Sequence, residues 1–80
     1  MHTSTSLQAV VYSTSRCLWC TQAVELLHRK GYCVEIKKVD TVLGLRTEML
    51  NFFPEAKTVP QCIVNGVTVG GFEKLTKYLK

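Results

Sequence analysis

The 80-residue sequence is short of several features that build membrane or secreted proteins. Its longest uninterrupted apolar runs are four residues, at 9–12 and 17–20, whereas a transmembrane helix needs about 20. Its four cysteines fall below the roughly 8–10% typical of small disulfide-built secreted domains. No basic stretch followed by an apolar one opens the chain, so no secretory signal is predicted. We therefore expect a cytoplasmic protein with no membrane partner.

Acidic residues are also scarce, six against ten Lys and Arg, which leaves a net charge of +4. No stripe of Lys and Arg with interleaved aromatic residues is present, so we expect no nucleic-acid partner. Modest positive charge instead suits an anionic small ligand. Leu, Ile, Val and Phe make up 24 of the 80 residues, above the roughly 20% below which chains tend to stay disordered. The sequence predicts one domain over residues 7–80, preceded by a flexible tail at 1–6.

The apolar pattern predicts the element order β-α-β-α-β-β-α. Strand-like runs occupy 7–12, 32–39, 61–64 and 67–69, and Asn65-Gly66 between the last two is a type I′ hairpin signal. Helical spacing of apolar residues covers 20–27, then Val42, Leu45, Met49 and Phe52, then 72–79. The first two strands flank a helix and should be parallel. We expect an α/β protein with a four-stranded mixed sheet flanked by helices, and the 32–39 strand at an edge.

The most informative motif is Cys17-Leu18-Trp19-Cys20, where the first strand passes into the first helix. Two cysteines three residues apart on a helical turn can bring their sulfurs to bonding distance. The free N–H groups and the dipole of the helix N-terminus favour the thiolate form of Cys17, as does the adjacent Arg16. A thiolate is the nucleophile of thiol–disulfide exchange. We predict that the Cys17 thiolate attacks a disulfide, and that Cys20, one turn deeper, is the thiol that resolves the mixed disulfide formed.

Three other interpretations of this pair are weaker. Two buried structural thiols at such a turn are one alternative. A zinc ribbon is another, but it needs a second Cys-x-x-Cys, and Cys33 and Cys62 are isolated. A cysteine hydrolase needs an imidazole beside the sulfur, whereas His28 lies eleven helical residues from Cys17, about 16 Å away. We therefore predict redox chemistry without a metal, and expect Cys33 and Cys62 to be buried strand thiols.

Two further segments have both a structural and a functional interpretation. Pro60 is tolerated at the first position of a strand, or it follows a cis bond that leaves the Val59 backbone free to pair with a peptide. Gly70-Gly71-Phe72-Glu73 is a tight turn before a helix, or a set of free N–H groups suited to a carboxylate. Trp19 lies in the first helical turn and is expected to be partly exposed, as an apolar platform.

Taken together, these motifs resemble those of the glutaredoxins. Tyr12-Ser13, Cys17-x-x-Cys20, Thr58-Val59-Pro60, Asn65-Gly66, Gly70-Gly71-Phe72 and Leu75 follow in this order, from about residue 8 to the C-terminus. The resemblance implies a thioredoxin-like fold and a cis proline at Pro60 facing the cysteines. It also implies a dithiol, glutathione-dependent thiol–disulfide oxidoreductase of electron transport and cell redox homeostasis. The compact length resembles that of viral or bacterial members.

The resemblance also implies roles for individual residues. Cys17 would hold the glutathionyl group, Cys20 would resolve protein disulfides, and Val59 would pair with the cysteinyl backbone of glutathione. Lys57 would meet the glycyl carboxylate, and the turn at Gly71, Phe72 and Glu73 would hold the γ-glutamyl end. The complete set of predicted glutathione contacts is Arg16, Trp19, Lys57, Thr58, Val59, Pro60, Gly71, Phe72 and Glu73.

The sequence departs from the family pattern at four points in this site. Leu18 stands where proline is common, and Trp19 where tyrosine is common. A lysine often found near Thr14 is absent, and Arg16 is expected to replace part of its charge. The acidic pair that often follows Gly-Gly is reduced to Glu73 followed by Lys74. These departures bear on the redox potential and on the strength of glutathione binding.

The implied partners are glutathione as co-substrate, disulfide-bearing proteins with ribonucleotide reductase as one candidate, and glutathione reductase indirectly. We expect a monomer. Two alternatives stay open: a small redoxin that takes electrons from thioredoxin reductase and serves ribonucleotide reductase, and a non-enzymatic iron–sulfur carrier bridged by Cys17 and glutathione thiols. Lys57 and the Gly-Gly-Phe-Glu turn favour glutathione over thioredoxin reductase.

Overall fold

The computed structural model describes residues 7–80, and the tail predicted at 1–6 lies outside the described residues. The predicted element order is confirmed, and none of the helices within 7–80 is long and apolar enough to cross a membrane. The elements are β1 (Gln8–Ser13), α1 (Leu18–Arg29), β2 (Cys33–Lys38), α2 (Leu45–Phe52), β3 (Gln61–Val64), β4 (Val67–Gly70) and α3 (Phe72–Tyr78).

The four strands form one mixed sheet in the order β2-β1-β3-β4. β1 and β2 are parallel, whereas β1 with β3 and β3 with β4 are antiparallel. The predicted edge position of β2 is therefore confirmed. Asn65 and Gly66 have φ values of 49° and 82°, which are the left-handed conformations that a type I′ turn requires.

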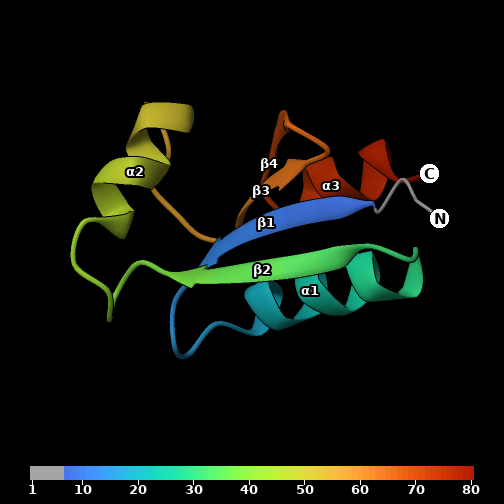
Figure 1. Cartoon of the computed structure of the whole chain (residues 1–80), viewed down its shortest axis with the longest axis horizontal. Helices are drawn as coiled ribbons and strands as arrows, with labels where there is room; N and C mark the ends of the chain where they lie inside the picture. Colours follow the sequence, from blue (N-terminus) through green and yellow to red (C-terminus); the bar gives the residue numbers. More distant parts are fainter. Residues whose placement is uncertain (1–6) are drawn as a thin grey trace, which may run out of the picture.

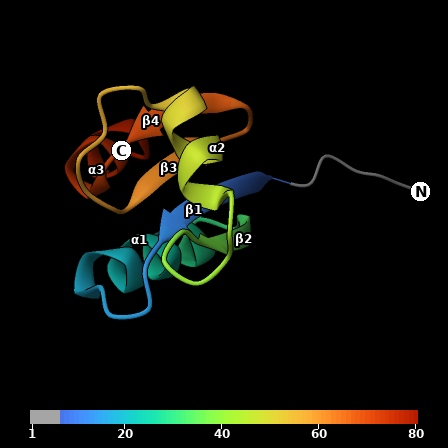
Figure 2. The same ribbon diagram turned by 90° about the vertical axis from the view of Figure 1, so that its left-hand side faces the viewer.

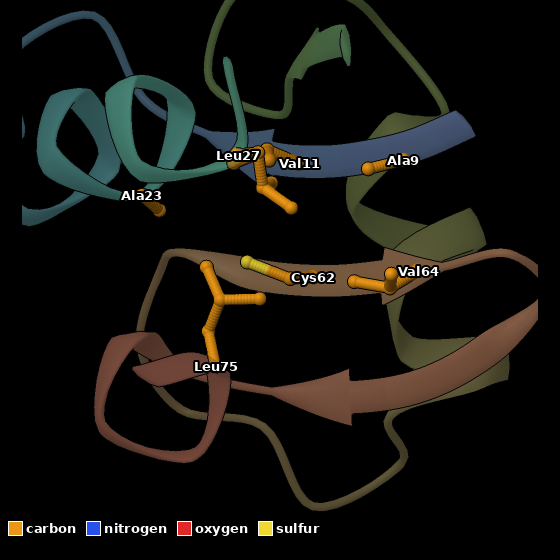
Figure 3. Close-up of a cluster of buried hydrophobic side chains, with 7 residues drawn as sticks. All are labelled: Ala9, Val11, Ala23, Leu27, Cys62, Val64 and Leu75. Atoms are coloured by element: carbon orange, nitrogen blue, oxygen red, sulfur yellow. The ribbon is translucent and has the colours of Figure 1, made fainter. Parts of the chain in front are cut away.

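The main core lies between the sheet and the two helices α1 and α3. It consists of Ala9, Val11, Ala23, Leu27, Cys62, Val64 and Leu75, all buried (Figure 3). Successive strand residues point to opposite faces, so Ala9 and Val11 of β1 reach this core while Val10 and Tyr12 face the other side. Each large side chain buried here contributes about 1.5–3 kcal/mol. This packing fixes α1, and with it the end of the helix that carries the cysteine pair.

The second helix lies on the other face and covers only part of it. Figure 1 shows α2 at the end toward which β1 and β2 run, and Figure 2, seen from that end, shows α1 and α3 together on one side of the strands. Met49 is the buried residue of α2, and it packs with Tyr12 and Val39.

Two expectations are wrong, one about the extent of a helix and one about the exposure of a thiol. Val42 does not belong to the second helix and is 51% exposed, because Gly44 at φ +91° interrupts the helical backbone just before Leu45. Cys33 is exposed rather than buried, whereas Cys62 is buried as expected. Cys33 and Lys37 lie on the same face of β2. The Lys37 side chain reaches α2, but α2 does not extend over the Cys33 end of that face, so Cys33 stays exposed.

A polar network ties α2 to the sheet. The Tyr12 hydroxyl donates to Glu48 Oε2 at 2.7 Å, and the Lys37 ammonium donates to the same oxygen at 2.6 Å. These two donors hold the pKa of Glu48 below its usual range, with Lys37 the larger cause. A carboxyl group with a lowered folded pKa contributes stability that is present above its unfolded pKa of about 4.3 and is lost as the pH falls through the folded value.

We therefore expect Glu48→Gln to lower the unfolding temperature at pH 7, and the difference from the unsubstituted chain to shrink as the pH falls below about 4. Thermal unfolding followed by circular dichroism at pH 7 and pH 3 measures this. Glu25→Gln, on the exposed side of α1, is the matched control and should have little effect at either pH. An equal loss at both pH values would show that the carboxylate charge is not what holds α2.

Candidate active site

Cys17 occupies the N-cap position of α1. Its backbone is extended, and its sulfur accepts a hydrogen bond from the Cys20 N–H at 3.2 Å. The thiol also lies 3.8 Å from the Val59 carbonyl oxygen, to which it donates. The free N–H groups and the positive dipole end of a helix N-terminus stabilise negative charge. The sulfur is partly exposed, so a thiolate formed there can reach a substrate.

The loop that leads into this N-cap is held by a side chain from beyond β2. The Ser15 N–H donates to Asp40 Oδ2 at 3.0 Å, and this bond is the main reason why the pKa of Asp40 lies below its usual range. Val39, next to it, donates its N–H to the Ser13 carbonyl at 2.9 Å. The β1–α1 loop that leads to the start of α1 is therefore held at two points, Ser13 and Ser15, by the segment that follows β2.

Cys20 differs from Cys17 in its surroundings. It is buried, and burial raises the pKa of its thiol to about 12, with the contact to Cys17 as the next cause. At pH 7 Cys20 is therefore a neutral thiol that a disulfide in solution does not reach. This geometry fits the predicted division of labour, in which Cys17 attacks first and Cys20 acts second.

A groove of about 470 Å³ runs beside the cysteine pair. Val59 forms one part of its wall and is followed by a cis peptide bond to Pro60, as the resemblance implied. The structure brings seven of the predicted glutathione contacts together in this lining: Trp19, Thr58, Val59, Pro60, Gly71, Phe72 and Glu73.

The predicted aromatic platform is present. Trp19 is 56% exposed, and its ring lies over Phe72 with the ring centroids 5.2 Å apart and the planes at 36°. Aromatic pairs prefer such offset or tilted arrangements. The two rings connect the first turn of α1 to the start of α3. Leu18, where the family commonly has proline, is 67% exposed and adds apolar surface beside the sulfur.

The two predicted cationic contacts lie elsewhere. Lys57 is exposed and lines an adjoining groove, and Arg16 is exposed and lines neither groove. Sequence reasoning also missed Gln61, which is buried and donates its side-chain amide to the Thr58 carbonyl at 2.9 Å. This bond holds the backbone just before Val59. A polar residue opening an otherwise apolar strand was the signal that could have identified it.

The fold and the site define a class of protein. A mixed four-stranded sheet, a Cys-x-x-Cys at the start of α1 and a cis proline opposite it are the features of a thioredoxin-like thiol–disulfide oxidoreductase. Residues 9–69 match the sequence model of the glutaredoxins. The chain belongs to the glutaredoxin family, and its Cys17–Cys20 pair fits the dithiol type.

Solved structures agree with this assignment. Wheat glutaredoxin is 27% identical, with a TM-score of 0.74 over 86% of this chain and 67% of the wheat chain. The glutaredoxin of Brucella melitensis is 28% identical, with a TM-score of 0.74 over 92% of this chain and 79% of its own. A buckwheat glutaredoxin–glutathione complex is 20% identical and shares the fold, with a TM-score of 0.75 over 89% of this chain and 66% of its own. No curated protein sequence matches the chain.

The burial of the four thiols predicts a labelling pattern. In the reduced protein at pH 7, iodoacetamide should modify Cys17 and Cys33 and spare Cys20 and Cys62, because burial raises the pKa of both spared thiols to about 12. Cys17 should react faster than Cys33, because only its sulfur lies at a helix N-terminus. Mass spectrometry of peptides after short labelling times measures the order. Equal rates at the two exposed thiols would mean that the N-cap environment does not activate Cys17.

Proposed function

We propose that this chain is a glutathione-dependent oxidoreductase that reduces protein disulfides and glutathione mixed disulfides. One observation carries the proposal: the sulfur of Cys17, at the N-cap of α1, lies 3.8 Å from the carbonyl oxygen of Val59, and Val59 lines a groove together with the Gly71–Glu73 turn. A sulfur with a peptide-binding groove alongside suits a small thiol peptide such as glutathione.

The dithiol reaction moves one electron pair in two exchanges. The Cys17 thiolate attacks one sulfur of a substrate disulfide, so the substrate S–S bond breaks, a Cys17–substrate disulfide forms, and the leaving sulfur takes up a proton. Cys20 then gives up its proton and attacks the Cys17 sulfur. The reduced substrate leaves, and a Cys17–Cys20 disulfide remains on the protein.

Glutathione reverses this oxidation in two further exchanges. A first glutathione thiolate attacks Cys17, which forms a mixed disulfide and frees Cys20 as a thiol. A second glutathione attacks the bound glutathione sulfur, so glutathione disulfide leaves and Cys17 is again a thiolate. Glutaredoxin potentials of about −200 to −230 mV lie close to a glutathione poise of about −220 to −260 mV, so the cytoplasmic glutathione pool can drive the cycle. Glutathione reductase would regenerate the glutathione.

The proposal assigns a position to each part of glutathione. The cysteinyl backbone would pair with Val59, and the γ-glutamyl end would lie at Gly71–Glu73 with its ammonium near Glu73. The glycyl carboxylate would meet Lys57, which lines the adjoining groove. The Trp19 and Phe72 rings form the apolar wall. That a buckwheat glutaredoxin of the same fold was solved as a glutathione complex supports this placement. We propose that the protein acts as a monomer, with ribonucleotide reductase as one candidate acceptor.

Substitution of each cysteine separates the two roles. Cys17→Ser should abolish reduction of every disulfide, because no other accessible thiol adjoins the groove. Cys20→Ser should still remove glutathione from a small mixed disulfide at a rate within about ten-fold of the unsubstituted chain, but should lose protein-disulfide reduction. The measurement is NADPH consumption coupled through glutathione and glutathione reductase. Normal turnover by Cys17→Ser would refute the assigned nucleophile.

The electron donor is tested with the unsubstituted protein. NADPH consumption should be fast with glutathione and glutathione reductase, and at least ten-fold slower with thioredoxin reductase alone at equal enzyme concentration. The opposite preference would identify the small redoxin alternative and refute glutathione dependence.

A further inference from the structure

A buried amide side chain lies behind the backbone that lines the active-site groove, the one of about 470 Å³ beside the cysteine pair. Gln61 opens β3 and is only 8% exposed. Its amide nitrogen donates to the Thr58 carbonyl oxygen at 2.9 Å. A carbonyl oxygen can only accept, so the nitrogen of the amide must face it. Because an unpaired buried amide is costly, the side chain and the carbonyl are held to each other.

The two sides of this loop belong to different grooves. Gln61 is the cross-strand partner of Tyr12, and directly opposite residues share a face of the sheet. Since Tyr12 packs with Met49 of α2, the Gln61 side chain lies on the α2 side. It lines the adjoining groove, whereas Val59 lines the active-site groove. The Thr58 carbonyl therefore points to the side of the loop away from the active-site groove.

The peptide unit between Thr58 and Val59 turns this contact into an orientation. The bond is trans, and in a planar trans unit the C=O and the N–H point in opposite directions. With its carbonyl held by Gln61, the unit directs the Val59 N–H away from Gln61. This is the side on which Val59 lines the active-site groove.

The Val59 N–H is a donor that the protein leaves unused. Within residues 7–80 it has no hydrogen-bond acceptor, although backbone N–H groups in folded proteins are nearly always paired. Val59 is only half-buried, and its own carbonyl oxygen lies 3.8 Å from the Cys17 sulfur. A ligand attached to that sulfur through a peptide-like backbone can therefore supply the missing acceptor.

We propose that Gln61 is a positioning residue for glutathione: it holds the Thr58 carbonyl so that the Val59 N–H meets the cysteinyl carbonyl of glutathione bound at Cys17. The inference rests on the proposed function, in which the cysteinyl backbone pairs with Val59. Gln61 lies outside the active-site groove, so it acts through the backbone and takes no part in the sulfur exchange. Its effect should depend on whether the disulfide partner carries a peptide backbone.

The test compares two disulfides at the same sulfur. The full chain carries Cys20→Ser, so that a mixed disulfide at Cys17 accumulates. It is equilibrated with glutathione disulfide and glutathione, or with the disulfide of 2-mercaptoethanol and its thiol. Each exchange breaks one S–S bond, forms one and releases one thiol. The modified fraction of the peptide that contains Cys17 is measured by mass spectrometry after acid quenching.

The ratio of the two equilibrium constants is the glutathione preference, because ionisation of Cys17 affects both constants equally. Gln61→Met keeps the length of the side chain and removes the donor. We expect it to lower the preference by about 3–10-fold, which is the effect of one hydrogen bond. Gln22→Met, on α1 and outside both grooves, makes the same chemical change and should keep the preference of the Cys20→Ser parent.

A second variant adds a pH dependence. Gln61→Glu should lose at least as much preference as Gln61→Met at pH 7, because an ionised carboxylate cannot donate to the Thr58 carbonyl. At about pH 4 the introduced carboxyl group is largely protonated and can donate, so the preference should recover relative to the Cys20→Ser parent at the same pH. If Gln61→Met does not fold, this comparison decides: a preference unchanged between the two pH values relative to the parent would overturn the proposal.

The outcomes separate this inference from the proposed function. A Cys20→Ser parent with equal constants for the two disulfides would refute glutathione recognition itself. A parent preference that Gln61→Met retains would overturn only the role of Gln61. An equal fall in both constants would also overturn that role, because the substitution would then disturb the Cys17 sulfur rather than the Val59 N–H.

Discussion

The chemistry of this protein depends on one local interaction, the hydrogen bond from the Cys20 N–H to the Cys17 sulfur at the first turn of α1. A sulfur placed there meets the positive end of the helix while it stays open to solvent. The placement holds only if α1 keeps its position, and the burial of Ala23 and Leu27 against β1 provides this. The core between α1 and the sheet is thus the physical support of the reactive group.

Burial then distinguishes the thiols from one another. Cys20 and Cys62 are both buried on the α1 side of the sheet, and burial raises the pKa of each to about 12. Cys33 is exposed, but it pairs with Gln8 at the start of β1, whereas Cys17 follows the end of that strand. Of the four sulfurs, only Cys17 combines access, a helix N-terminus and an adjoining groove. Selectivity for one cysteine therefore comes from solvent exposure and helix geometry rather than from composition.

The end of α2 forms part of a groove of about 650 Å³ that adjoins the active-site groove. Met49 is the buried residue of α2, and the Glu48 carboxylate, bonded to Tyr12 and Lys37, supplies the specific contacts to the sheet. Phe52, at the end of the same helix, forms part of the groove wall. The network around Glu48 therefore connects the stability of α2 to the shape of this groove.

Local sequence determined much of this protein. The order of elements, the Asn65-Gly66 hairpin and the cysteine pair at a strand–helix junction follow from periodicity and turn chemistry over a few residues. The exposure of Cys33, the bond from Gln61 to Thr58 and the meeting of Trp19, Val59 and Glu73 in one groove were decided by the tertiary structure alone. These features depend on which part of a sheet face a distant helix covers and on contacts between separate segments, and neither is encoded in the spacing of neighbouring residues.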